Sequence, residues 1–367
     1  MPKVFVSACG TSLLTNGADN SLRSLLISTS NEKETQLASE DKATIDKHLQ
    51  TRTQLLQNAS LSEIKRLSAE LNGIVTYYED SLPSSGEDLH YILGTDTYQG
   101  EAVADMVVTW LRDRGLNAQS HTIQDLATKN LDCFRAAMSD LIEWCDRSLG
   151  GYQAQDYYQV IFNLTGGFKS VNGFLQAAGM FYADECIYIF QGSSQLLRIP
   201  RLPITLDTDG IIAKHLTTFR QLQQQDQVAL SDCQGIPETL LFQDKDFAGL
   251  SEWGKLIWKQ GKPKYYEREL LPPLSSQLIY SSKFKQSVKG IQPDRLHILN
   301  ERLDDLSQYL DSHGNDNPPK LDFKKLKGKP FADSTHECDV WGDRGDRIYG
   351  HYLPDGRYQC DRLDKHL

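Results

Sequence analysis

Four short apolar runs, separated by amphipathic segments, most constrain how the first two hundred residues of this chain fold. Continuous runs of this kind are typical of parallel strands covered on both faces, and they lie at residues 4–8, 90–93, 158–162 and 186–190. Between them, apolar residues recur at helical spacing over about residues 101–114, 126–149 and 170–182. Strand, helix and strand in succession predict an α/β fold, a parallel sheet with right-handed crossovers.

The pattern along the chain predicts three parts. Residues 1–205 form the α/β domain, in which a polar helical insertion occupies about residues 18–88. Residues 206–275 are expected to form a helical connector of two or three helices. Residues 276–367 predict the order β-α-α-β-β-β, a small α+β domain whose last two strands are joined by the turn signal Pro354-Asp355-Gly356.

Composition excludes several classes of protein. The chain has 367 residues, of which 39% are hydrophobic, so it can fill cores and is not disordered throughout. No apolar run approaches the roughly 20 residues of a membrane helix, and residues 2–8 reach Cys9-Gly10 too soon for a signal peptide. We therefore expect a soluble, cytoplasmic protein. Seven cysteines without a CxxC pair exclude a zinc ribbon or a disulfide framework.

Charge is distributed unevenly. The net charge of −10 argues against a basic nucleic-acid-binding coat over the whole protein. Residues 278–367, however, hold nine Lys and six Arg against fifteen Asp and Glu, together with five of the nine His. The acidic excess therefore lies upstream, and the last segment has a different task from the rest.

Polar and glycine residues follow three of the predicted strands. Because the carboxyl ends of parallel strands share one edge, where ligands bind at a reversal of strand order, these loops predict a ligand site. Glycine admits close approach, hydroxyls donate hydrogen bonds, and a helix N-terminus and a lysine attract phosphate. The candidate residues are Gly10, Thr11 and Ser12; Gly94, Thr95, Asp96 and Thr97; and Asn163, Thr165, Gly166, Gly167 and Lys169.

At these residues the chain resembles the CRISPR-associated Rossmann-fold (CARF) sensor domains. The resemblance covers about residues 1–205 and rests on Gly10-Thr11-Ser12-Leu13-Leu14, on Asn163-Leu164-Thr165-Gly166-Gly167-Phe168-Lys169, and on the segment from Ile189 to Pro203. It implies a homodimer that binds one cyclic oligoadenylate, usually cyclic tetra-adenylate, across its two-fold axis. Some members also cleave the ligand, which makes Ser12 and Lys169 candidates for ring-nuclease activity.

The last segment carries a second candidate site. A lysine-rich stretch at residues 320–329 leads into a predicted strand with His336, and Arg347 lies on the next predicted strand. Adjacent antiparallel strands are expected to gather His336, Arg347 and His366 on one face, a set that suits anionic backbone recognition and proton transfer. Neither HExxH nor paired His-x-His spacing occurs, so no metal cofactor is expected.

The order of elements in residues 276–367 resembles the RelE-like mRNA interferase toxins. In this resemblance Arg347 matches the third-strand arginine that stabilises the scissile phosphate, and His366 matches the terminal general acid. His336 or a loop lysine such as Lys327 is the candidate general base, and Lys365 completes the catalytic set. The chemistry implied is metal-independent attack of the ribose 2′-OH on the adjacent phosphate.

The two resemblances together imply a sensor–toxin fusion, a CARF–RelE mRNA interferase of type III CRISPR antiviral defence. Its expected partners are a second copy of the chain, a cyclic oligoadenylate, mRNA and the translating ribosome, with no membrane. Two alternatives stay open. One is a ligand-gated DNA-binding regulator whose connector around Leu250-Ser251-Glu252-Trp253-Gly254 is a winged helix. The other is a ring nuclease with an inert C-terminal segment.

Overall fold

The structure is a computed structural model, and it divides the chain into two compact units, Met1–Thr205 and Leu206–Leu367. The residues that it describes are 1–83, 86–124, 126, 131–153, 157–190, 192–203, 208–225, 227–327, 331, 333–342 and 345–366. Among the helices of the described residues, none combines the length and the apolar composition that crossing a bilayer requires. The seven cysteines all lie in the described part and are free thiols, six of them buried.

The first unit is a doubly wound α/β domain. Its sheet has the order β3-β2-β1-β4-β5-β6, in which only β6 is antiparallel to its neighbour. The strands are β1 (Lys3–Ala8), β2 (Leu89–Thr95), β3 (Asn117–Ile123), β4 (Gln159–Asn163), β5 (Glu185–Ile189) and β6 (Leu196–Pro200). The expected parallel sheet is therefore confirmed. The expectation from apolar runs omitted β3 and β6, the two edge strands.

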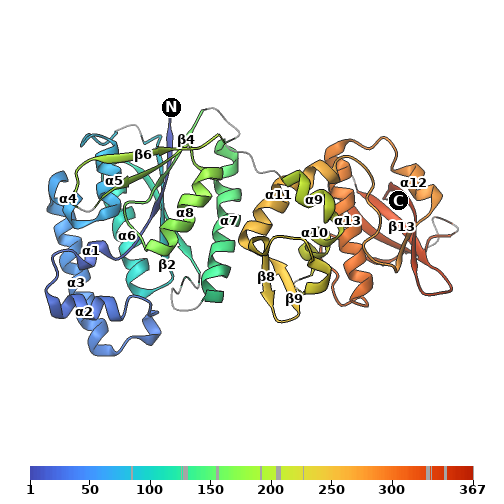
Figure 1. Cartoon of the computed structure of the whole chain (residues 1–367), viewed down its shortest axis with the longest axis horizontal. Helices are drawn as coiled ribbons and strands as arrows, with labels where there is room; N and C mark the ends of the chain where they lie inside the picture. The colour runs from blue at the N-terminus through green and yellow to red at the C-terminus, as the bar shows by residue number, and fades with distance from the viewer. Residues whose placement is uncertain are drawn as a thin grey trace. The chain divides into compact units, whose positions relative to one another are not determined.

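Helices cover both faces of this sheet, as Figure 1 shows, with α7 and α8 on one face and the other helices opposite. The helices are α1 (Ser12–Thr15), α2 (Asn20–Ser28), α3 (Ser39–Asn58), α4 (Leu61–Leu67), α5 (Ala69–Tyr77), α6 (Tyr98–Arg112), α7 (Leu131–Gln153) and α8 (Lys169–Tyr182). The insertion at residues 18–88 is helical as expected. Its apolar side chains, such as Ile45, Ile64 and Ile74, are fully buried in one core with α6.

The second unit starts with the connector, which is less helical than expected. Its elements are α9 (Thr208–Lys214), α10 (Leu216–Gln224), β7 (Val228–Ala229), β8 (Leu241–Asp244), β9 (Phe247–Leu250) and α11 (Glu252–Tyr266). The three strands form a small sheet of order β7-β9-β8. The chain leaves α10 at Gln224 and enters β7 at Val228. The strands escaped prediction because each has four residues or fewer.

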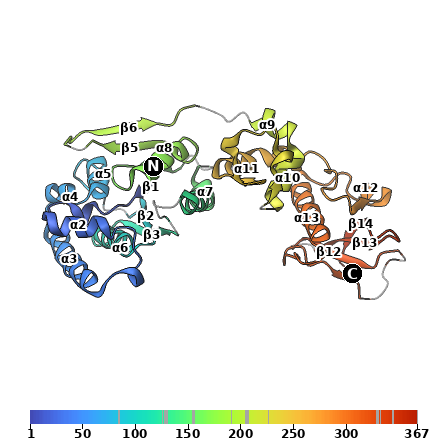
Figure 2. The same cartoon turned by 60° about the horizontal axis from the view of Figure 1, so that its bottom comes forward.

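The remainder of the second unit is a five-stranded sheet backed by two helices. Its elements are β10 (Leu278–Tyr280), α12 (Ser282–Ser287), α13 (Pro293–Asp311), β11 (Lys324–Lys325), β12 (His336–Trp341), β13 (Asp346–Tyr352) and β14 (Tyr358–Lys365). The sheet has the order β10-β14-β13-β12-β11, and β10 runs parallel to β14 while the other pairs are antiparallel. Helices α12 and α13 cover one face (Figure 2). The short β11 adds one strand to the expected order.

Candidate functional site

The loops after β1 and β4 meet where the strand order of the first unit reverses. β1 pairs in parallel with both β2 and β4, so the two loops leave the same edge of the sheet. They touch, because a Cβ built on Gly10 would lie 3.1 Å from the Cα of Gly167. Gly167 has a φ of +87°, which favours glycine. The structure thus brings together two of the three predicted ligand loops.

A carboxylate that the sequence analysis missed, that of Glu70 in the first turn of α5, lies beneath these loops. Its Oε1 accepts the N–H of Gly10 at 2.9 Å, and its Oε2 accepts the hydroxyls of Ser12 at 2.9 Å and Ser68 at 2.7 Å. Gly166 lies against it, since a Cβ there would be 2.2 Å from Oε1. Three donors satisfy this fully buried side chain, which ties the insertion to the β1 loop.

Several predicted ligand contacts are therefore used inside the fold. Asn163 is fully buried, and its Nδ2 donates to Ser7 Oγ at 3.2 Å and to the carbonyl of Glu70 at 2.9 Å, while its Oδ1 accepts the N–H of Thr165. Its expected role as a ligand contact is replaced by one in holding the loop. The sequence signal for Glu70 is weak: a serine two residues earlier, at the start of an apolar helix.

The groups that remain for an anion lie at the start of α8. Phe168, its N-cap residue, makes no side-chain hydrogen bond to the helix. The hydroxyl of Thr165 is buried and has no hydrogen-bond partner among the described residues. Lys169, the first residue of α8, is exposed. A helix N-terminus favours negative charge, so the expectation that these groups contact a phosphate stays a prediction.

The third predicted loop, Gly94 to Thr97, is covered by the insertion. Thr95 and Thr97 bond to each other through their hydroxyls at 2.8 Å, and Thr97 caps α6 by accepting the N–H of Gly100. Asp96 forms an ion pair with Lys33 of the insertion at 2.7 Å. All four loop residues are buried, so this loop caps a helix and anchors the insertion instead of facing a ligand.

Glu70→Ala is expected to raise local hydrogen–deuterium exchange about 100-fold in peptides that cover residues 4–16 and 61–77. The substitution leaves the N–H of Gly10 and two hydroxyls without their acceptor, a cost of about 3 kcal/mol, and each 1.4 kcal/mol corresponds to a factor of ten. Glu101→Ala, an exposed carboxylate in the first turn of α6, is the control. Equal exchange in both variants would refute the structural role of Glu70.

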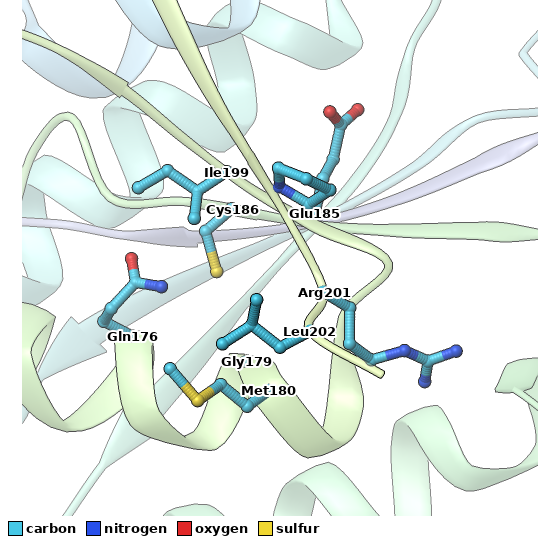
Figure 3. A pocket seen from close by; sticks show the side chains of 9 residues that line it. Gln176, Gly179, Met180, Glu185, Cys186, Ile199, Arg201 and Leu202 are labelled. Carbon is cyan, nitrogen blue, oxygen red and sulfur yellow. The ribbon is translucent and has the colours of Figure 1, made fainter. Parts of the chain in front are cut away.

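A small apolar pocket lies elsewhere in this unit, between α8 and the β5–β6 pair (Figure 3). Its volume is about 100 Å³, and Cys186, Met180 and Ile199 are among its lining residues. Ligand pockets usually measure about 300 Å³ or more. The pocket includes Glu185, the first residue of β5, and so lies toward the edge opposite the two loops. It is therefore not the predicted nucleotide site.

In the second unit, Arg347 lies on the face of the five-stranded sheet that α12 and α13 leave uncovered. We call this the outer face, and its residues are Glu337, Asp339, Arg347, Tyr349, His351, Gln359, Asp361, Arg362 and Asp364. Arg347 Nε lies 2.9 Å from Oδ1 of Asp339 on the neighbouring β12. With 14% of its side chain exposed, the guanidinium is held in place and reaches the surface.

The chain end lies at the same end of the sheet as Arg347. Lys365 pairs with Asp346 in the β13–β14 register, and the N–H of His366 donates to the carbonyl of Gly345 at 2.8 Å. The side chains of Lys365 and His366 are exposed. Lys327 is also exposed and follows β11, whereas Gly328 and Lys329 of the lysine-rich stretch lie outside the described residues.

The expectation that His336 shares a face with Arg347 is wrong. The register pairs His336 with Gly350 and Arg347 with Asp339, which places the two side chains on opposite faces. The His336 ring stacks on Phe323, a core residue, at 5.3 Å between centroids. Burial, with Lys325 nearby, lowers the pKa of His336 below its usual value. Its catalytic role stays a prediction without geometric support.

Within the described ranges, no group of three or more His, Cys, Asp or Glu side chains is arranged to hold a metal ion.

Three comparisons relate this chain to known proteins. A search of curated proteins finds no match. Among solved structures, Csm6 of Enterococcus italicus bound to cyclic hexa-2′-fluoro-hexa-dAMP matches with a TM-score of 0.28 and 10% identity, over 84% of this chain. The match spans 63% of the Csm6 chain. Residues 65–202 match the family model Cas_APE2256, described as a CRISPR-associated protein. The part of the chain that holds Glu70, the β4 loop and α8 is thus similar to a CRISPR-associated family.

Proposed function

We propose that this protein is a CRISPR-associated endoribonuclease whose first unit binds a cyclic oligoadenylate and whose second unit then cleaves mRNA. The observation that carries the proposal is the meeting of the β1 and β4 loops at the strand reversal, within a segment that matches a CRISPR-associated family. A sensor of a CRISPR signal needs an anion site, and the start of α8 offers one.

The proposed ligand is cyclic tetra-adenylate, bound by a homodimer across its two-fold axis. Each copy would contribute Lys169, the hydroxyl of Thr165 and the N-terminus of α8 to the ring of phosphates. The buried carboxylate of Glu70 lies under the same loops, so Lys169 has to outweigh a nearby negative charge. Ser12 is tied to Glu70 and to the N–H of Ala69 at 3.0 Å. Ring-nuclease activity through Ser12 and Lys169 is part of this proposal.

The second unit would be the ribonuclease, in the manner of the RelE-like toxins. Support comes from its order of elements, a strand and two helices followed by antiparallel strands, with the first strand parallel to the last. Arg347 would stabilise the negative charge that develops as the ribose 2′-OH attacks the adjacent phosphate. Lys327 and His366 are exposed and would contact the RNA backbone, whereas the register places Lys365 on the face opposite Arg347. The proposed substrate is mRNA on the translating ribosome, since the segment carries no net positive charge for free RNA.

The DNA-binding alternative has less support. The segment named for it, residues 250–254, enters α11, which carries the lysines Lys255, Lys259, Lys262 and Lys264. Helix α10, which precedes the small connector sheet, has Arg220 as its one cationic residue. Arg220 is buried against Asp304 and is not available for phosphates. A gel shift with duplex DNA, run beside the ribonuclease assay, separates the two functions.

The test is to incubate the purified protein with translating ribosomes and cyclic adenylates of each ring size, and to map the mRNA ends. We expect strong cleavage when the ligand and ribosomes are both present and slow cleavage of ribosome-free RNA. Magnesium chelation should leave the slow rate on ribosome-free RNA unchanged. Equal cleavage with and without every ring would refute the sensor coupling.

Lys169→Ala is expected to weaken binding of cyclic tetra-adenylate about 10- to 100-fold, measured by calorimetry. A charge-assisted hydrogen bond contributes about 1.5 to 3 kcal/mol, and 1.4 kcal/mol is a factor of ten in affinity. Lys47→Ala, an exposed lysine on α3, is the matched control and is expected to bind like the wild type. Equal weakening in both variants would show that only overall charge matters.

A further inference from the structure

A histidine–carboxylate pair lies on the outer face of the second unit, formed by His351 of β13 and Asp361 of β14. His351 Nδ1 lies 2.8 Å from Asp361 Oδ2. The same carboxylate accepts the hydroxyl of Ser334 at 2.9 Å and the side-chain amide of Gln359 at 3.1 Å. Asp361 is 7% exposed, whereas 25% of the His351 side chain is exposed. A buried, fully bonded carboxylate thus orients a histidine that reaches the surface.

A β-bulge lies at this pair. The β13–β14 register runs from Gly350 opposite Cys360 to Tyr349 opposite Arg362, so Asp361 is the extra residue. A bulge of this kind re-aims a side chain and is frequent beside active sites. Gly350 is required here, because a Cβ at this position would lie 2.3 Å from the carbonyl oxygen of Gln359.

The hydrogen bond determines the chemistry of the ring. A carboxylate only accepts, so Nδ1 carries the proton and Nε2 has a lone pair that can take one. The carboxylate also stabilises the imidazolium that forms when Nε2 is protonated. Such a pair suits a general base, whereas a purely structural tie would not need an exposed ring.

The surroundings of the pair favour a nucleic acid. Arg362, next to Asp361, lies with its guanidinium 4.2 Å from the centre of the Phe331 ring, and Phe331 contacts Tyr349 at 4.8 Å. Arg347 is four residues from His351 on the same face of one strand, roughly 13 Å away at the rise of a β-strand. Tyr349 is 1% exposed, so of this aromatic pair only the partly exposed Phe331 is left to support a base or ribose.

We propose that His351 is the general base of the ribonuclease and that Asp361 is its positioning residue, with an RNA phosphodiester as the substrate. The proposal rests on the proposed function of the second unit. The 2′-oxygen gives its proton to His351 Nε2 and bonds to phosphorus while the P–O5′ bond breaks. The 5′-oxygen takes a proton from solvent, and His351 later returns its proton to solvent. His351 thereby replaces His336, whose ring lies on the core side of the sheet.

The test compares single-turnover cleavage by the full chain, activated by cyclic tetra-adenylate on translating ribosomes, with and without added imidazole. His351→Ala is expected to cleave at least 100-fold more slowly, the usual contribution of a general base. Added imidazole should raise the cleavage rate of His351→Ala at least tenfold. A purely structural role of His351 would not explain such a rescue. Binding of an RNA with a 2′-deoxy substitution at the cleaved position should stay within threefold. His313→Asn, in an exposed turn at a φ of +52°, is the control.

A wild-type rate in His351→Ala, or a loss that imidazole does not restore while RNA binding is intact, would overturn the assignment. If the variant fails to fold, Asp361→Asn serves instead: it is expected to slow cleavage at least tenfold, with Asp361→Glu restoring part of the rate. Absence of cleavage by the wild type under every ligand would instead refute the proposed function, so the two failures are distinguishable.

Discussion

Asp304→Ala is expected to lower the free energy of unfolding of the second unit by about 3 to 5 kcal/mol, the cost of removing one partner of a buried ion pair. Asp304 on α13 and Arg220 on α10 are 1% and 2% exposed, and Oδ1 lies 2.5 Å from Nη2. The hydroxyl of Tyr266 on α11 also donates to Asp304. Alanine at position 304 leaves the guanidinium charged, buried and without its partner.

The measurement is urea unfolding, combined with hydrogen–deuterium exchange of peptides from residues 208–366. The matched control is the triple variant Arg220→Met, Tyr266→Phe and Asp304→Leu, which removes the whole polar cluster. Replacing a buried ion pair by apolar side chains of similar volume is often neutral or stabilising, so we expect its stability within about 2 kcal/mol of the wild type. If the single variant is as stable as the wild type, the cluster does not hold the connector to α13.

The cluster matters for function because it joins the connector to the proposed ribonuclease sheet. Asn300 on α13 adds three hydrogen bonds of 2.9 Å, to the N–H of Leu271 and to the carbonyls of Tyr266 and Glu269. Lys262 of α11 pairs with Glu301 at 2.5 Å. Connector and sheet are therefore held together by buried polar contacts. In the proposed function, a signal that reaches the connector is passed directly to α13 and the sheet that it covers.

The sequence predicts the central strands of the first unit well and its edges poorly. Central strands are buried on both faces, so β1 and β4 read as continuous apolar runs. β3, with the sequence NAQSHTI, and β6, with LLRIP, lie at the two edges and are partly exposed. Because exposed positions of an edge strand can be polar, these two strands lack the continuous apolar run by which the central strands were predicted. Glu70 also escaped prediction, because two of its partners, Gly10 and Ser12, lie about 60 residues away along the chain.

The faces of the second sheet are partly encoded in the sequence. His336 is two residues from Cys338, which is fully buried, whereas Arg347 adjoins Ile348, which is also fully buried. Since alternate residues of a strand face opposite sides, these neighbours already separate His336 from Arg347. The bulge at Asp361 is different, because it shifts the alternation within β14. Only the pairing of the two strands reveals the bulge and shows that Gln359, and with it Asp361, lies on the face of His351.

Arg347→Ala is expected to lower the single-turnover rate of mRNA cleavage about 100- to 1000-fold, as the loss of one preorganised charge-stabilising donor does in other enzymes. The ion pair with Asp339 engages Nε, so the terminal guanidinium nitrogens can still donate to a phosphate. Because the charge develops in the transition state, the rate should fall more than the affinity for RNA. Arg347→Lys should recover only part of the rate, since an ammonium lacks the planar fork.

The double variant Arg347→Ala/Asp339→Ala separates catalysis from folding. In the single variant Asp339 loses the guanidinium that lies 2.9 Å from its carboxylate, which itself destabilises the sheet. The double variant removes that unpaired charge, so its unfolding midpoint should return toward the wild type while its cleavage rate stays low. A rate that recovers together with stability would mean that Arg347 only holds β12 to β13. A rate that stays low in a well-folded sheet assigns the arginine to the phosphate.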